Sequence, residues 1–191
     1  MSHRVCPWWL GYLLAGPWRR LLDDPRKVLA PYVREGMTVL EPGPGMGFFT
    51  LEIARLVGPS GRVVAVDLQA RMLSGLKRRA ARAGLLERVD LRLATPTSLA
   101  VSDLNAVADF TLVFAVVHEL PAAAPFFAEL ATASKPGGGL LFAEPSGHVK
   151  PPAFEVELQA ATQAGFALQS RPEIWRSHAA YLIKSDGQRT K

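Results

Sequence analysis

The sequence contains very little cysteine, since Cys6 is the only one among 191 residues. One thiol excludes a disulfide within the chain and a metal site built from cysteines, and we expect no metal cofactor. The apolar start, residues 5–16, is too short to span a bilayer. Pro7 and Gly11 interrupt it and no small-x-small cleavage site follows, which argues against an export signal. We therefore expect a cytoplasmic protein with no membrane span.

A strong excess of charge of one sign is also absent. The net charge is only +5, and the basic residues are scattered apart from the stretch Arg71–Arg82 and the last few residues. This distribution favours a solvated surface over a nucleic-acid interface, which stays as the alternative. Hydrophobic residues make up 49% of the chain and charged residues 20%, which is typical of a globular protein. At this length we expect one domain with a full core.

The most informative stretch is residues 37–50, with the sequence MTVLEPGPGMGFFT. It predicts a buried strand over Met37–Leu40, followed by an acidic residue, three alternate glycines and a helix. The glycines Gly43, Gly45 and Gly47 let the backbone turn sharply and leave room for a ligand against the main chain. The turn also presents the free amides of a helix N-terminus to that ligand.

Two details separate this turn from a dinucleotide-binding fingerprint. The glycines are spaced GxGxG rather than GxGxxG, and Glu41 stands two positions before Gly43. A carboxylate at that place would repel a pyrophosphate, whereas it suits a cationic amino-acid head group. The combination therefore favours S-adenosylmethionine over NAD as the ligand.

Apolar runs and helical periodicities alternate along the rest of the chain. Continuous apolar runs predict strands that are buried on both faces, and apolar residues at helical spacing predict the helices between them. The expected strands after the glycine turn are Val63–Val66, Val89–Leu93, Asp109–Val117, Leu140–Ala143, Phe166–Ser170 and Ala179–Lys184. The expected helices are Arg26–Tyr32, Gln69–Ala83, Pro125–Ala133 and Pro152–Ala164, with a further one after the glycine turn. The alternation indicates a parallel α/β sheet whose ligand lies at the carboxyl ends of the first strands.

The pattern acid-x-Gly-x-Gly-x-Gly over residues 41–47 resembles the first motif of the Rossmann-like, class I S-adenosylmethionine-dependent methyltransferases. The turn Lys135–Gly139 before an apolar strand is a second hallmark, and the landmarks keep the family's order over residues 33–184. The resemblance implies a three-layer Rossmann-like α/β fold. Its sheet would have seven mostly parallel strands, a C-terminal antiparallel hairpin and helices on both faces. It also implies methyl transfer from S-adenosylmethionine, with S-adenosylhomocysteine as product.

The resemblance also divides the chain into three parts. Residues 1–36 form an N-terminal helical or lid segment, residues 37–184 the S-adenosylmethionine-binding methyltransferase domain, and residues 185–191 a flexible tail. Two interpretations of the first part stay open, a lid over the cofactor and substrate or an additional helix that closes the core. Tyr12 and Trp18 are its candidate pocket residues.

In the cofactor site that the resemblance implies, Glu41 faces the methionyl ammonium. Asp67, at the end of the second strand, would accept hydrogen bonds from both ribose hydroxyls. The turn residues expected against the carboxypropyl and ribose portions are Gly43, Pro44, Gly45 and Gly47.

The adenine end of the site departs from the family pattern. Thr95 stands where family members often carry an aspartate that accepts the adenine amino group, and a threonine oxygen can accept the same hydrogen bond. Pro96 follows it in the same loop. Leu68 and Met72 are expected either on the adenine face or in the core. Ala115, near the end of the fourth strand, completes the set of cofactor candidates.

His118 and Glu119 follow the fourth strand, where related enzymes place residues that face both cofactor and substrate, and they are the candidate catalytic residues. The His118 imidazole could deprotonate a hydroxyl or amine acceptor, or it could only cap the strand end, and both interpretations stay open. Glu144 and His148 are expected in a solvated loop, with substrate contact as the alternative.

The nature of the acceptor is indicated by a missing motif. The sequence lacks the Asn/Asp-Pro-Pro-Tyr tetrapeptide with which some nucleic-acid amino-methyltransferases hold a planar amino group, and His118–Pro121 stands in its place. This favours a small-molecule acceptor as the partner. The alternatives are an RNA or protein methyltransferase that docks through Arg71–Arg82 and Arg19–Arg20, and a module that binds S-adenosylmethionine without transferring its methyl group.

Overall fold

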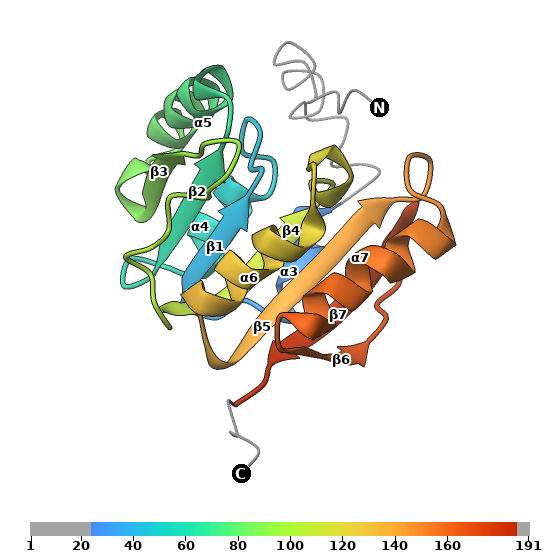
Figure 1. Cartoon of the computed structure of the whole chain (residues 1–191). Coiled ribbons are helices and arrows are strands. Elements are labelled where there is room, and N and C mark those ends of the chain that lie inside the picture. The colour runs from blue at the N-terminus through green and yellow to red at the C-terminus, as the bar shows by residue number, and fades with distance from the viewer. Residues whose placement is uncertain (1–23, 187–191) are drawn as a thin grey trace. The chain divides into compact units, whose positions relative to one another are not determined.

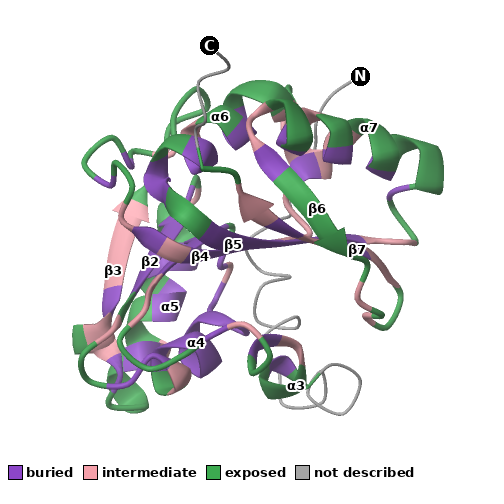
Figure 2. Ribbon diagram, turned by 90° about the horizontal axis from the view of Figure 1, so that it is seen from below, coloured by how far each residue is buried: buried purple, intermediate pink, exposed green. Residues whose placement is uncertain are grey.

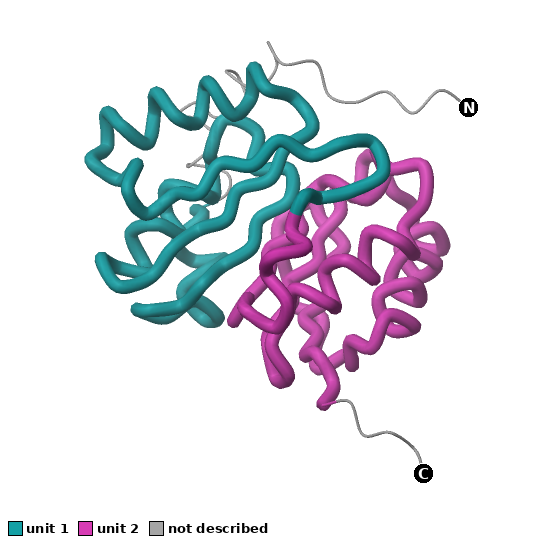
Figure 3. Tube along the Cα trace, turned by 60° about the vertical axis from the view of Figure 1, so that its left-hand side comes forward, with its two compact units in different colours: residues 1–100 teal, residues 101–191 magenta. Residues whose placement is uncertain are grey.

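The structure, a computed structural model, describes residues 24–186 of the chain. The segment before Asp24, with the pocket candidates Tyr12 and Trp18, lies outside the described residues, as does the end of the expected tail. By their internal contacts, residues Met1–Ala100 and Val101–Lys191 form two compact units (Figure 3).

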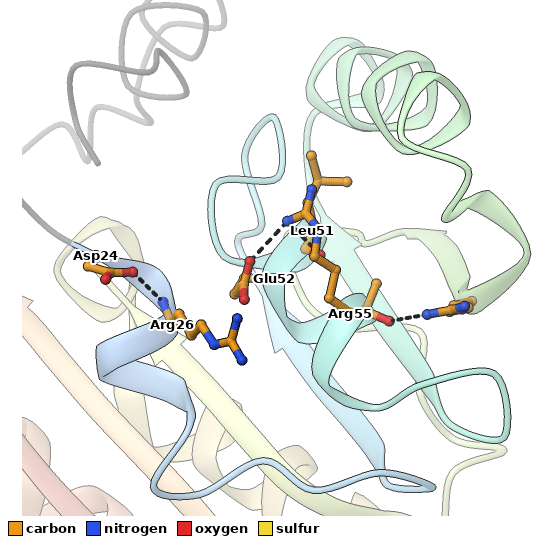
Figure 4. A network of polar contacts seen from close by, with 7 residues as sticks. Asp24, Arg26, Leu51, Glu52 and Arg55 are labelled. Carbon is orange, nitrogen blue, oxygen red and sulfur yellow. Dashed lines mark hydrogen bonds and ion pairs between the residues drawn. The ribbon is translucent and has the colours of Figure 1, made fainter. Parts of the chain in front are cut away.

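The first unit begins with α3, whose start follows from its local sequence. The Asp24 carboxylate accepts a hydrogen bond from the backbone N–H of Arg26 at 3.0 Å, and Pro25 occupies the first helical position, where no N–H is needed (Figure 4). A half-buried ion pair in this unit joins Arg55 to Glu52 at 2.9 Å. The elements of the unit are α3 (Pro25–Leu29), β1 (Thr38–Pro42), α4 (Thr50–Leu56), β2 (Arg62–Asp67), α5 (Ala70–Arg82), η1 (Leu86–Arg88) and β3 (Val89–Leu93) (Figure 1).

The three strands of this unit are parallel, with β2 paired to both β1 and β3. The residues Val63–Val66 are at most 1% exposed, as their continuous apolar run predicts for a strand covered on both faces. In α5, Met72, Leu76 and Ala80 are buried while Arg71 and Arg82 are exposed, which confirms the predicted helical periodicity.

The second unit carries the rest of the sheet and two long helices. Its elements are β4 (Ala108–Phe114), η2 (Val117–Glu119), α6 (Ala123–Ala133), β5 (Ser134–Pro145), α7 (Pro151–Gln163), β6 (Phe166–Ser170) and β7 (Ser177–Lys184). β4 and β5 are parallel, whereas β7 is antiparallel to both β5 and β6. Aromatic rings join β5 to both helices, because Phe142 lies with its ring centroid 5.4 Å from that of Phe127 and 4.9 Å from that of Phe154. Figure 2 shows that most of β5 is buried, whereas most of β6 is exposed.

The seven strands form one sheet in the order β3-β2-β1-β4-β5-β7-β6, flanked by helices. The expected Rossmann-like α/β fold, mostly parallel with a C-terminal antiparallel hairpin, is therefore confirmed. No helix among residues 24–186 is long and apolar enough to cross a membrane.

Two predicted strand boundaries are wrong, and each error has a backbone cause. β4 ends at Phe114 rather than at Val117, because Ala115 adopts a left-handed conformation (φ 59°) that breaks the strand. β5 begins at Ser134, so the predicted turn over Lys135–Gly139 is the irregular first part of that strand. Gly137 has φ 74° there, which a residue with a side chain rarely adopts.

Candidate active site

The glycine turn that follows β1 has the backbone that its sequence predicts. Gly43, Gly45 and Gly47 have φ values of 68°, 54° and 84°, all in the left-handed region that favours glycine. The surroundings of two of them differ. A Cβ added at Gly47 would lie 2.3 Å from Leu76 Cδ1, whereas a Cβ added at Gly45 would meet no atom of the described chain within 4 Å. Gly47 is thus favoured by its left-handed φ and by its contact with Leu76, whereas Gly45 borders open space.

This contrast predicts different consequences for the same substitution. Gly47→Ala is expected to lower the free energy of unfolding by about 2–5 kcal/mol, combining left-handed strain with overpacking against Leu76. Gly45→Ala is expected to cost only about 1–2 kcal/mol of strain while placing a methyl group where a ligand would approach the backbone. Chemical denaturation and ligand titration of both variants check this. The interpretation fails if Gly45→Ala binds the ligand as tightly as the wild type.

Glu41 lies inside β1 rather than after it, and its side chain is only 3% exposed. Among the described residues none donates a hydrogen bond to its buried Oε2 atom. Burial raises the pKa of this carboxyl group to about 8; the Thr50 hydroxyl opposes the rise and the nearby charge of Asp67 adds to it. A buried acceptor without a donor is costly, so a cationic or hydrogen-bonding ligand group at this position would be stabilising.

Asp67 is the last residue of β2 and is 8% exposed. The parallel pairing of β1 with β2 places it beside the glycine turn, since the Gly43 amide donates to the carbonyl of Val66 at 2.8 Å. Asp67 Oδ1 accepts a hydrogen bond from the Gln69 amide at 2.8 Å, which fixes the carboxylate at the start of α5. Two carboxylates and a left-handed glycine turn therefore meet at the carboxyl ends of adjacent strands.

The expected adenine contacts lie in the same unit. The loop after β3 starts beside Asp67, because the Ala94 amide donates to the Asp67 carbonyl at 3.0 Å. Thr95 and Pro96 in that loop are exposed, whereas Pro44 in the glycine turn is buried. Leu68 is 43% exposed, which contradicts a place in the core.

In the second unit, Glu144 differs most from the sequence-based expectation. The prediction of a solvated loop is wrong, because Glu144 belongs to β5 and is fully buried. Its Oε1 accepts hydrogen bonds from the amides of Val116 and Val117 at 3.1 and 2.7 Å, and its Oε2 contacts His118 Nδ1 at 2.5 Å. The carboxylate thus organises the whole turn after β4, where Ala115 and Glu119 also lie.

His118 is half-buried and bound to Glu144 through one ring nitrogen. The hydrogen bond to Glu144 raises the pKa of His118 above its ordinary value. Because a carboxylate only accepts, Nδ1 carries the proton, and Nε2 is the nitrogen that can accept one in the neutral ring. His148 is exposed and stacks edge-on, with its ring centroid 5.5 Å from that of His118.

Sequence analysis missed two half-buried polar residues near this pair. Glu157 on α7 has its pKa raised to about 7 by burial and by the charge of Glu144. His178 on β7 stands opposite Glu144 in the β5–β7 register. Within the described part of the chain, Glu157 Oε2 and His178 Nε2 are buried without a hydrogen-bond partner. Helical spacing from the buried Phe154 would have pointed to Glu157, whereas nothing in the sequence indicates the strand register.

Over residues 24–186, no cluster of three or more histidine, cysteine, aspartate or glutamate side chains is arranged to hold a metal ion. Each unit has its own chemical groups. The first unit has buried carboxylates beside an open glycine turn, and the second has an imidazole whose tautomer is fixed by a buried glutamate.

Comparison with known proteins agrees with this geometry. A family model described as "Methyltransferase domain" matches residues 33–187. A SAM-dependent methyltransferase from Aquifex aeolicus, solved by crystallography, is 26% identical with a TM-score of 0.84, over 94% of this chain and 100% of that one. No curated protein sequence matches the chain.

Two more distant solved structures show likeness of fold alone. A SAM-dependent O-methyltransferase from Thermotoga maritima is 17% identical with a TM-score of 0.64, over 87% of this chain and 66% of that one. The [4+2]-cyclase SpnF is 21% identical with a TM-score of 0.68, over 85% of this chain and 63% of that one. Proteins named for different reactions thus share the fold, so the acceptor and the chemistry have to be argued from the site.

Proposed function

The chain belongs to the methyltransferase-domain family and is a SAM-dependent methyltransferase, and from this premise we propose that its methyl acceptor is a small molecule. The main support for the cofactor site is the buried Oε2 of Glu41, to which no group in residues 24–186 donates a hydrogen bond. In this proposal, that carboxylate binds the methionyl ammonium of S-adenosylmethionine. The glycine turn receives the carboxypropyl and ribose portions, and Asp67 binds the ribose hydroxyls.

When bound, S-adenosylmethionine supplies a methyl group already activated by its sulfonium centre. The protein then has to align the acceptor and remove its proton. In the proposed mechanism His118 does the second task, since Glu144 holds its Nδ1 and leaves Nε2 to accept the proton of a hydroxyl or amine. The buried Glu144 carboxylate stabilises the imidazolium that forms.

Support for a small acceptor comes from the turn after β4. His118–Pro121 stands where some nucleic-acid methyltransferases carry a tetrapeptide that holds a planar amino group.

One observation favours the second candidate, an RNA acceptor. The helix α5 contains five basic and no acidic residues, namely Arg71, Lys77, Arg78, Arg79 and Arg82.

Calorimetric titration tests the cofactor site and is followed by an acceptor screen. We expect S-adenosylmethionine and S-adenosylhomocysteine to bind and NAD not to bind. Asp67→Ala should lose at least about tenfold in affinity, because hydrogen bonds to charged groups contribute roughly 1.5–3 kcal/mol. Binding of NAD alone would contradict the assignment of the glycine turn.

The acceptor class is tested by following S-adenosylhomocysteine release with panels of small hydroxyl and amine compounds and with RNA. Turnover of a small molecule supports the proposal. Turnover of RNA alone, with binding that weakens steeply as salt rises, would replace it with the second candidate.

A further inference from the structure

The glycine turn is held by one face of α5. Arg79 donates a hydrogen bond from Nη1 to the backbone carbonyl of Met46, the residue between Gly45 and Gly47. Gly75, one helical turn earlier, lies against the Met46 side chain, because an added Cβ would be 3.0 Å from Met46 Cγ. Leu76 packs against Gly47 on the same side. The helix thus contacts both the main chain and the side chain of the turn.

The opposite end of α5 is tied to the second half of the cofactor site. The Asp67 carboxylate accepts a hydrogen bond from the Gln69 amide, and α5 begins at the next residue. One continuous helix of 13 residues therefore connects the ribose-binding carboxylate at its start with the glycine turn near its end. A rigid helix between two parts of a site fixes the distance between them.

We propose that Arg79 is a positioning residue for the cofactor, which rests on the cofactor site proposed above. Its guanidinium holds the Met46 carbonyl and thereby keeps the turn Gly43–Gly47 in the conformation that receives S-adenosylmethionine, in register with Asp67. Arg79 itself touches no part of the ligand in this proposal.

The physical need for such a contact follows from the composition of the turn. Glycines lose more conformational freedom on ordering than other residues, and Gly45 borders open space rather than packed atoms of the described chain. Without a contact from outside the turn, the entropy lost on ordering the turn would weaken ligand binding. A hydrogen bond from a charged guanidinium to the turn's own carbonyl orders it in advance, which raises affinity through preorganisation.

The competing explanation is that Arg79 only stabilises α5, since a basic side chain in the last turn interacts favourably with the helix dipole. Arg82 provides the matched control, because it lies in the same last turn and is exposed. Arg79→Met and Arg82→Met remove the same charge from the same helix end, but only the first removes the hydrogen bond to Met46. Arg79→Lys restores a donor with a different shape.

We expect Arg79→Met to bind S-adenosylhomocysteine about tenfold more weakly than the wild type, with KM for S-adenosylmethionine raised and kcat little changed. The affinity of Arg82→Met should stay within about twofold of the wild type, and Arg79→Lys should recover most of the affinity that Arg79→Met loses. Hydrogen exchange of the backbone amides of Gly43 and of residues 45–49 should become faster in Arg79→Met alone. Equal losses in Arg79→Met and Arg82→Met, or unchanged exchange in the turn, would overturn the proposal.

Gly75→Ala supplies a second test that does not rely on removing a charge. Alanine has a higher helix propensity than glycine, which offsets part of the cost of moving Met46. Its methyl group, 3.0 Å from Met46 Cγ and 3.1 Å from Met46 Sδ, should displace the turn and weaken S-adenosylhomocysteine binding. Affinity equal to the wild type in both Gly75→Ala and Arg79→Met would refute the positioning role. Failure of the wild type itself to bind would instead refute the cofactor site.

Discussion

Glu41→Gln is expected to abolish S-adenosylmethionine binding and to stabilise the free protein above about pH 7. The folded pKa of Glu41 is about 8, well above the ordinary carboxyl value. Between those two pKa values the folded state binds more protons than the unfolded state, so the wild type loses stability as pH rises, by up to about 1.4 kcal/mol per pH unit. Glutamine imitates the protonated acid at every pH. Chemical denaturation at pH 6 and pH 9 should show that the free energy of unfolding falls with pH in the wild type but not in the variant.

The same carboxyl group should make cofactor binding depend on pH. At pH 7 the free Glu41 is largely protonated, and pairing with an ammonium requires it to release that proton. An α-amino group loses its own proton near pH ~7.7–8.0. Affinity should therefore rise from pH 6 to an optimum near pH ~8 and then fall. Calorimetry in two buffers of different ionisation enthalpy measures the released proton directly. A pH-independent affinity would show that Glu41 is not the ammonium ligand.

The first unit was largely predictable because its signals are local. The run Val63–Val66 predicts a strand buried on both faces, and the spacing of Met72, Leu76 and Ala80 marks one face of a helix. The position of Glu41 was indicated by its spacing from the three alternate glycines that follow it. Its Oε2 has no donor within the described part of the chain and its pKa is raised, and both depend on how tightly β1 is covered, which residue spacing does not reveal.

The second unit was less predictable because its site depends on contacts between distant segments. Glu144 follows an apolar run and precedes a proline, which resembles a strand end at the surface. Its burial follows from pairing of β5 with β7 and from two amides of the turn after β4, 27 and 28 residues earlier. Neither the antiparallel register nor the left-handed Ala115 that redirects that turn has a sequence signature.

Glu144→Gln is expected to lower kcat on the order of 10²-fold, the lower end of what general-base catalysis contributes. The glutamine carbonyl can still accept from the amides of Val116 and Val117, so the turn should keep its shape. Its NH₂ group, however, would face His118 Nδ1. The ring would then accept at Nδ1 and carry its proton on Nε2, which is the wrong tautomer for removing a proton from the acceptor.

The pH profile separates this effect from a general loss of structure. In the wild type the hydrogen bond to Glu144 raises the pKa of His118, so activity should rise with pH through a value above the ordinary histidine range. Glu144→Gln removes that bond, and the acidic limb should move to lower pH. Glu157→Gln is the matched control, because Glu157 also raises the pKa of His118 but only through its charge, and it should shift the limb less. An acidic limb that stays in place in Glu144→Gln, with kcat unchanged, would remove His118 from the mechanism and leave the strand-capping interpretation.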